Sequence, residues 1–225
     1  MKNVTIDDIK ANSAKFRSNL KHEVGFYDYS RIAKIPFRLE SYIRTLNSRI
    51  SDHIDSIILL YEAEHIIPAF GLIRSNFESL ALLNRLSIAF RNSMDNQKLD
   101  ESLDSDLATM ALGLREKDYP VQAINILTQL KKMEKEWKGV MPIYESISEF
   151  VHPNYDGVIG SYSDFDHEQK KALLEPQYQS KSEIAIGALN FVNAQMTIAE
   201  FLSNYMIKNL KPFAAICELD LRKNS

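Results

Sequence analysis

Apolar residues in this chain recur every three or four positions almost from end to end, and few residues interrupt the pattern. This spacing places apolar side chains on one face of an α-helix. The 225 residues include only 7 glycines and 7 prolines, so turns are scarce and a fold of many short strands is disfavoured. The sequence therefore predicts an all-α fold built from long helices.

The periodicity indicates about seven helices, which we expect to form an up-and-down-like bundle. The expected helices cover residues 5–23, 36–67, 69–91, 106–118, 120–138, 142–151 and 181–210. Thr5 is a plausible N-cap for the first. Pro68 should break or kink the second, Pro120 should begin the fifth, and Pro212 should stop the last.

The remaining segments are expected to be connections or weak elements. Residues 92–106 are polar and acidic, and "YDGVIGSYSDFD" is the most loop-like stretch. A weak helix is expected near residues 166–174, and residues 213–221 would add one short element. Neither is as strongly periodic as the long helices.

No shift in composition divides the chain, so we expect one domain over residues 1–225. Residues 1–35 would form an N-terminal helix and connection, residues 36–210 the bundle core and residues 211–225 a C-terminal extension. A chain of this length buries roughly 70 to 75% of its extended surface on folding, which is enough for a substantial core.

Charge and cysteine content narrow the class of protein. A formal net charge of -3 and a pI near 6.0 give no broad basic surface for nucleic acid. Cys217 is the single cysteine, which excludes an intramolecular disulfide and fits a reducing compartment. The longest uncharged run, residues 184–199, is too short and too polar to cross a bilayer. We expect a cytoplasmic protein with no membrane segment.

The stretch "AFGLIRSNFESLALLNRLSIAF" is apolar on nearly every side, which is typical of a central helix. At about 100° per residue, Arg74, Glu78 and Arg85 fall within an arc of roughly 40°. Such a narrow charged stripe either faces a slot that reaches solvent or is paired inside the protein. Both interpretations stay open, and the second includes a structural pair of Arg74 with Glu78.

The last long helix carries a similar polar line. Asn193, Thr197, Glu200 and Asn204 step by four, three and four residues along an otherwise apolar helix. If this line and the charged stripe both face inward, they share one pocket. The alternative is that the line is the solvent side of its helix.

The segment "ISEFVHPNYDGVIGSY" brings His152 to the end of a predicted helix, where Pro153 disfavours further helix. His152 is either a simple C-terminal residue favoured by the helix dipole, or part of a loop that enters the same pocket. The resulting candidate catalytic residues are His152, Arg74 and Glu78, and the candidate binding residues are Ser148, Asn154, Tyr155, Asn193 and Glu200.

A metal site is an alternative for the same region. Glu62 and His65, and likewise Glu149 and His152, have the Glu-x-x-His spacing of carboxylate-bridged di-metal bundles. Glu78 and Glu200 would supply the other two carboxylates. Both pairs lie about one turn before a proline, however, whereas such a site needs positions within continuous helices. No cofactor is expected outside this alternative.

An all-helical chain with "IPAFGLIRSNFESLALLNRL", its Arg-x-x-x-Glu on a central helix, and a later "SISEFVHPN" resembles the HEPN-like helical domains of prokaryotes. That group includes uncharacterised members found near mobile and defence genes. The resemblance covers residues 36–210. It implies a helical bundle that often dimerises and, in catalytic members, cleaves RNA through an arginine and a later histidine with four to six residues between them.

The chain departs from that catalytic pattern. The only matching spacing is Arg17 to His22, on the first helix, so we do not assign ribonuclease activity to those residues. We expect a binding or regulatory module for a nucleotide, an RNA or a protein partner in a stress or defence system. The alternatives are a divergent metal-independent ribonuclease, with His152 as general acid or base and Arg74 stabilising phosphorane charge, and the di-metal enzyme.

Overall fold

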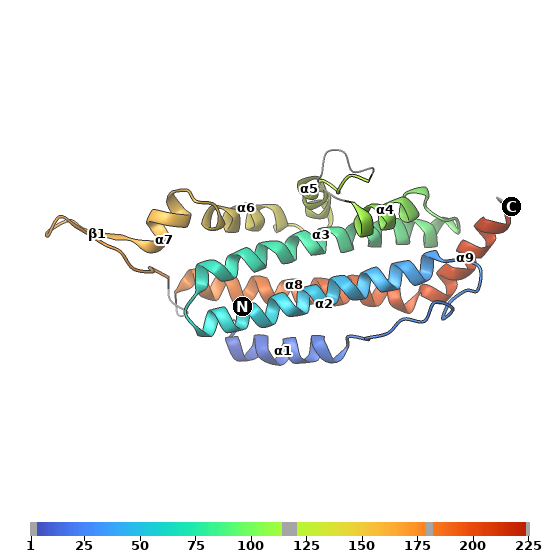
Figure 1. The fold of residues 1–225 in the computed structure, drawn as a ribbon, viewed down its shortest axis with the longest axis horizontal. Helices are drawn as coiled ribbons and strands as arrows, with labels where there is room; N and C mark the ends of the chain where they lie inside the picture. The colour runs from blue at the N-terminus through green and yellow to red at the C-terminus, as the bar shows by residue number, and fades with distance from the viewer. Residues whose placement is uncertain (1–3, 114–120, 179–181, 224–225) are drawn as a thin grey trace.

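The computed structural model describes residues 4–113, 121–178 and 182–223. The fold is all-α apart from one small β-hairpin, which agrees with the predicted class (Figure 1). The described ranges contain nine α-helices against the seven or so expected. Part of the difference is that the segment after residue 210 forms a full helix and the predicted loop near residue 160 contains a short one.

Three long helices lie side by side along the length of the molecule (Figure 1). They are α2 (Ile35–Glu62), α3 (Ile66–Asn96) and α8 (Glu183–Lys208). At 1.5 Å per residue they span roughly 42, 46 and 39 Å. The buried stripe of α2 keeps helical spacing throughout, at Leu39, Ile43, Leu46, Ile50, Ile54 and Ile57.

The two terminal helices join the same core. Helix α1 (Ile6–Ser18) packs against α2 and α8, and α9 (Leu210–Lys223) packs against α2, α3 and α8. Thr5 caps α1 as predicted: its hydroxyl accepts the backbone N–H of Asp8, whose carboxylate accepts the N–H of Thr5. The helix ends at Ser18, five residues before the expected boundary.

A second group of helices covers the opposite side of α3. These are α4 (Glu101–Leu112), α5 (Ile126–Glu136) and α6 (Val140–Val151), and each contacts α3 directly. Helix α3 is thus enclosed between α2 and α8 on one side and α4, α5 and α6 on the other (Figure 1). This enclosure explains why its sequence is apolar on nearly every side.

By length and composition alone, α3 is apolar enough to cross a membrane, and no other helix in the described ranges meets that criterion. The protein itself buries 56% of the most apolar 18-residue window of α3. The uncharged run that the sequence singled out, residues 184–199, lies in α8 instead.

Two prolines begin helices where they were expected to end them. Pro68 is the third residue of α3, and Pro212 is the third residue of α9. The first-turn N–H groups of a helix have no acceptor within the helix, so proline is tolerated there. The break between α2 and α3 falls just earlier, where Glu64 adopts a left-handed φ of 60°. Pro120 lies outside the described residues.

The expected weak helix at residues 166–174 is wrong, because these residues form most of a β-hairpin. Strand β1 (Asp164–Asp166) pairs antiparallel with β2 (Lys171–Leu173). The Asp166 carboxylate accepts the backbone N–H groups of the two residues at 168 and 169, at 3.0 and 2.9 Å. Lys170 then takes a left-handed φ of 53°. This local turn competes with the helix.

One turn of π-helix and one short α-helix connect α6 to the hairpin. They are η1 (Tyr155–Ile159) and α7 (Gly160–Tyr162), within the segment that was expected to be a loop. Together with the hairpin they project from one end of the bundle (Figure 1).

The packing of the core predicts that two leucines contribute very differently to the free energy of unfolding. Leu80 on α3 is fully buried, whereas Leu59 on α2 is 68% exposed. We expect Leu80→Ala to lower the free energy of unfolding by about 3 kcal/mol through lost burial and a cavity, and Leu59→Ala to change it by less than about 0.5 kcal/mol. Urea denaturation of both variants measures this, and equal losses would contradict the placement of α3.

The buried thiol of Cys217 on α9 predicts that the free energy of unfolding depends on pH. Burial raises the pKa of its thiol from 9.0 to about 12. In the unfolded chain the thiol ionises at lower pH than in the native protein, so the stability that it contributes is complete below pH 9 and is lost as the pH rises towards 12. The unfolding free energy of the wild type should therefore fall relative to that of Cys217→Ala between pH 9 and 10.5. A constant difference between the two proteins would refute this.

Candidate functional site

Tyr144 of α6 holds together two charged residues of α3. The Arg74 Nε donates to the Tyr144 hydroxyl at 3.0 Å, and that hydroxyl donates to Glu78 Oε1 at 2.9 Å. Arg74 also lies 3.6 Å from the same carboxylate and places its guanidinium 5.2 Å from the centre of the Tyr144 ring. The three side chains form one charge-compensated cluster.

Tyr144 is itself buried at the helix interface. Burial raises the pKa of its phenol above the ordinary value, the bond to Glu78 adds to the increase and Arg74 opposes it. The phenol therefore keeps its proton at neutral pH and serves as a donor to Glu78. Arg74 and Glu78 retain partial exposure, at 25% and 33% of their side-chain surface.

The third member of the charged stripe, Arg85, is also paired. It makes a two-pronged contact with Asp106 of α4, with Nε 2.7 Å from Oδ2 and Nη2 bonded to Oδ1. Nearby, the buried Asn84 accepts the indole N–H of Trp137 at 3.2 Å. Of the two interpretations of the stripe, the structure favours internal pairing for all three charged residues.

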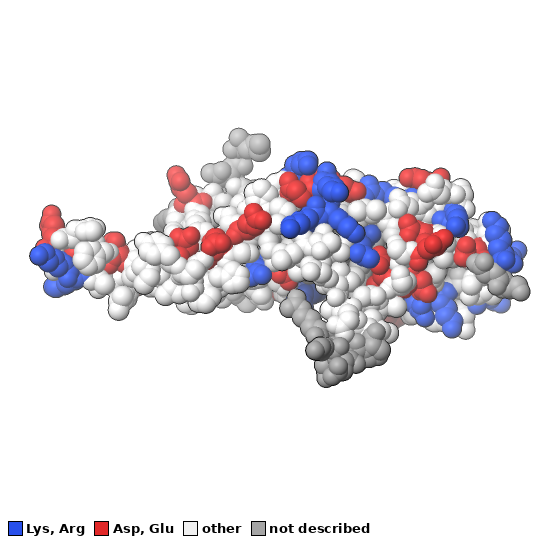
Figure 2. Space-filling model, turned by 90° about the horizontal axis from the view of Figure 1, so that it is seen from above, with Lys and Arg blue, Asp and Glu red and all other residues white. Residues whose placement is uncertain are grey.

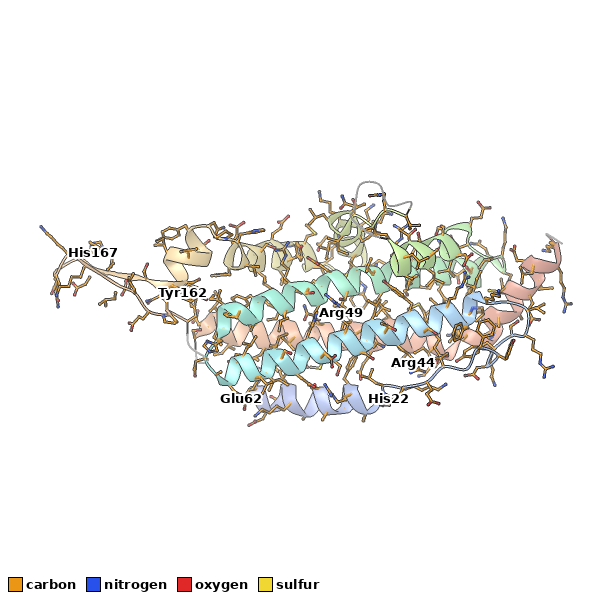
Figure 3. All side chains as sticks on the ribbon, viewed as in Figure 1. His22, Arg44, Arg49, Glu62, Tyr162 and His167 are labelled. Carbon is orange, nitrogen blue, oxygen red and sulfur yellow. The ribbon has the colours of Figure 1, made fainter. Side chains whose placement is uncertain are left out.

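A cavity of about 320 Å³ opens beside Glu78, between α2, α3, α4 and the start of α5. Its polar lining consists of Tyr42, Arg49, Ser75, Glu78, Ser79 and Thr109. Arg49 reaches it from α2 and donates to the Ser75 hydroxyl at 2.9 Å (Figure 3). The rest of the lining is mainly aliphatic, including Leu46, Leu82, Met110 and Ile126. Glu78 thus belongs both to the charged cluster and to a cavity wall.

His152 does not join this cluster. It follows the last residue of α6, its side chain is exposed, and its backbone N–H bonds to the Ser148 carbonyl at 3.0 Å. It lies eight residues beyond Tyr144, or about 12 Å along the helix axis. Within the described ranges no hydrogen bond links His152 to Arg74 or Glu78. His152 therefore lies at the C-terminal end of α6, which is the position that the helix-end interpretation describes.

The other residues of that segment have local roles. The Ser148 hydroxyl donates to the Tyr144 carbonyl at 2.7 Å. Asn154 donates to the Glu149 carboxylate and accepts the backbone N–H of Gly157, so it caps η1. Tyr155 is 71% exposed at the start of the projecting segment. Only the contact of Ser148 reaches a residue of the Arg74 cluster, and it does so through the backbone of Tyr144 and not through its hydroxyl.

The polar line of α8 faces α1 instead of the cluster. Asn193 accepts from Asn12 of α1 at 2.8 Å, whereas Gln195 donates to the Ile73 carbonyl of α3 at 2.8 Å. Residues two apart point about 200° apart around a helix, so Asn193 lies on the side away from α3. Glu200 lines a separate cavity, formed by α1, α2 and α8, together with Arg44. The single shared pocket expected from the two lines does not form.

The di-metal alternative is not supported by the geometry of its proposed ligands. Glu62 at the end of α2 pairs with Lys10 of α1, while His65 is exposed just before α3. Glu78, Glu149 and Glu200 lie in three different environments, as described above. Within residues 4–113, 121–178 and 182–223, no three histidine, cysteine or carboxylate side chains are grouped so that they could hold a metal ion.

Sequence reasoning missed two residues of the site. Tyr144 lies on the buried stripe of α6 with Val140 and Ile147, and a tyrosine on such a stripe needs a polar partner for its hydroxyl. That requirement could have paired it with the charged stripe of α3. The sequence around Arg49 gives no sign of a site, because Arg49 is exposed on α2. It borders the cavity only because α4 and α5 pack beside it.

Comparisons of the chain with protein-family models, with curated proteins and with solved structures found no match.

The charged cluster predicts that the Tyr144 hydroxyl stabilises the α3–α6 contact. Tyr144→Phe removes one acceptor from Arg74 and one donor from Glu78, so the unfolding free energy should fall by about 1 to 3 kcal/mol. Tyr155→Phe, which alters an exposed phenol on the next element, should change it by less than about 0.5 kcal/mol. Denaturant titrations of the two variants provide the comparison, and a neutral Tyr144→Phe would refute the bridging role.

Proposed function

We propose that this protein is a binding module that takes a nucleotide in the cavity between α2, α3, α4 and α5. The observation that carries the proposal is the charge balance of the cavity wall. Glu78 is neutralised by Arg74 and by the Tyr144 hydroxyl, whereas Arg49 has no carboxylate partner among the described residues. The cavity therefore presents a net positive group to a ligand.

The rest of the lining matches the two halves of a nucleotide. The hydroxyl groups of Ser75 and Thr109 line the same cavity as Arg49 and can donate to phosphate or ribose oxygens. The Ser79 hydroxyl, also in the lining, already donates to the Ser75 carbonyl and is left to accept a hydrogen bond from a ribose hydroxyl. The aliphatic side chains of the lining offer an apolar surface for a base. A volume of about 320 Å³ falls at the lower end of the range for small-molecule sites.

Binding is favoured over catalysis at this cavity. Its described lining contains no histidine or cysteine that could transfer a proton near neutral pH or act as a nucleophile. Glu78 is the one carboxylate among the described lining residues, and its hydrogen bond from Tyr144 and its pairing with Arg74 oppose its use as a base. A single nucleotide also suits a cavity of about 320 Å³ better than an RNA strand does, since the acidic chain offers no broad basic surface for RNA.

The family and setting are part of the same proposal. We infer an HEPN-like domain in a cytoplasmic stress or defence system. The support is the all-helical bundle and the Arg74-x-x-x-Glu78 pair on its enclosed central helix. The nucleotide would then act as the regulating ligand of the module.

A thermal-shift series with nucleoside mono-, di- and triphosphates and with inorganic phosphate tests the proposal. Ligand at 100 times its Kd adds about 2.7 kcal/mol of stability, which corresponds to a rise in Tm of roughly 5 to 10 °C for a chain of this size. We expect at least one nucleotide to produce such a rise and Arg49→Gln to abolish it.

Arg91→Gln is the matched control, because it removes a guanidinium from α3 that pairs with Glu136 on α5, outside the cavity lining. Its shift should equal that of the wild type. A nucleotide-induced shift that survives Arg49→Gln, or no shift with any nucleotide, would exclude this site.

A further inference from the structure

The segment from Val151 to Leu174 carries an unusual amount of exposed apolar surface; we call it the arm. It comprises η1, α7 and the β-hairpin, and it projects from one end of the bundle (Figures 1 and 3). Its largest exposed apolar side chains are Tyr155, Ile159, Tyr162, Phe165, Leu173 and Leu174, with exposures from 40% to 82%. Exposed apolar residues gathered on one projection mark an interaction surface.

We propose that the arm binds the arm of a second copy of this chain, forming a two-fold symmetric dimer in which the β2 strands pair edge to edge. The hairpin is two-stranded in the described structure, so both of its edges lack a neighbouring strand. An isolated hairpin of this size is only marginally stable, and a four-stranded sheet would satisfy the free backbone groups of β2.

The charges of the two strands select the β2 edge. A two-fold pairing of β1 with its copy, centred on Phe165, would set Asp164 opposite the partner's Asp166 twice, and like charges directly opposite destabilise a sheet. Pairing of β2 with its copy, centred on Ala172, sets Lys171 opposite Leu173 at two symmetric positions. No lysine then faces a lysine.

The same register builds a continuous apolar row. Phe165 pairs with Ala172 inside each hairpin, so side chains at these two positions share one face of the sheet. Joining the β2 edges at Ala172 places the two alanines between the two phenylalanines. The small alanine side chains leave room for the rings to pack over the centre of the sheet.

The exposed area is sufficient for a dimer. The six largest apolar side chains of the arm are each 40% to 82% exposed, and since a whole aromatic side chain has roughly 150 to 250 Å² of surface, together they expose several hundred Å². This approaches the roughly 800 Å² that each partner buries in a stable protein interface. A lipid surface fits the arm less well. The arm carries four carboxylates, at Asp156, Asp164, Asp166 and Glu168, against the lysines at 170 and 171, and anionic membranes attract basic segments. Figure 2 shows the charges at the tip of the arm and uncharged surface between the tip and the bundle.

The proposed strand register can be tested in the full-length chain with one charge substitution and one compensating substitution. Light scattering with size-exclusion chromatography should give twice the chain mass for the wild type at micromolar concentrations. Leu173→Lys places the new lysine opposite Lys171 of the other copy at two symmetric positions, so dimerisation should weaken about tenfold or more. Adding Lys171→Glu to that variant restores an opposite-charge pair across the two-fold axis and should recover about tenfold in affinity.

Leu59→Lys is the matched control, since Leu59 is 68% exposed on α2, away from the arm, and this variant should dimerise like the wild type. Circular dichroism and Tm values confirm that every variant remains folded. A monomeric wild type, a Leu173→Lys variant that dimerises normally, or a double variant with no recovery would each overturn the proposal.

A cysteine at the predicted two-fold axis gives an independent readout. Ala172→Cys should form a disulfide-linked dimer on mild oxidation, because the two positions face each other across the axis. The native Cys217 is buried and should not interfere. Leu59→Cys should stay monomeric on a non-reducing gel. If Ala172→Cys does not cross-link, or if the protein binds anionic vesicles without self-association, the β2-edge dimer is wrong.

Discussion

Enclosure of α3 between two groups of helices is the constraint on which the rest of the structure depends. A helix covered by α2 and α8 on one side and by α4, α5 and α6 on the other has little access to water along its length. Polar side chains on its enclosed faces then need partners within the protein. Tyr144 of α6, Asp106 of α4 and Trp137, between α5 and α6, supply such partners.

These polar contacts also fix how the covering helices sit. An apolar interface tolerates small rotations and slides, whereas Arg85 meets Asp106 in a two-pronged geometry that fixes the position of α4. Tyr144 fixes α6 in the same way by bonding both Arg74 and Glu78. The cavity beside Glu78 is bounded by α2, α3, α4 and the start of α5, so the fixed position of α4 sets one of its walls.

The helices could largely be predicted from the sequence, because periodicity and capping are local properties. Thr5 with Asp8 gave the start of α1, and the all-round apolar pattern of α3 gave its central place. The errors arose where local signals have two meanings. Pro68 and Pro212 stop a helix or begin one equally well, and the side chain of Asp166 turned an expected helix into a hairpin.

The candidate site was less predictable, because it depends on which helices meet. Arg74 and Glu78 could be identified as a pair from their four-residue spacing, and the structure places them together. Their neighbours, Tyr144 and Arg49, come from helices 70 and 25 residues away in the sequence. His152, Asn193 and Glu200 were grouped with them only by assuming that all polar lines face one pocket, and the rotation of α8 directs its line towards α1.

Helix α6 has a consequence for how the two ends of the molecule are linked. Near its middle Tyr144 bonds to Glu78 at the edge of the cavity, and at its end the chain passes directly into the arm. A helix of this length is stiff, so a displacement of Tyr144 is transmitted over about 12 Å to the root of the projection. A ligand in the cavity and a second copy at the arm, both proposed above, would therefore act on the same helix through the hydrogen bond from Tyr144 to Glu78.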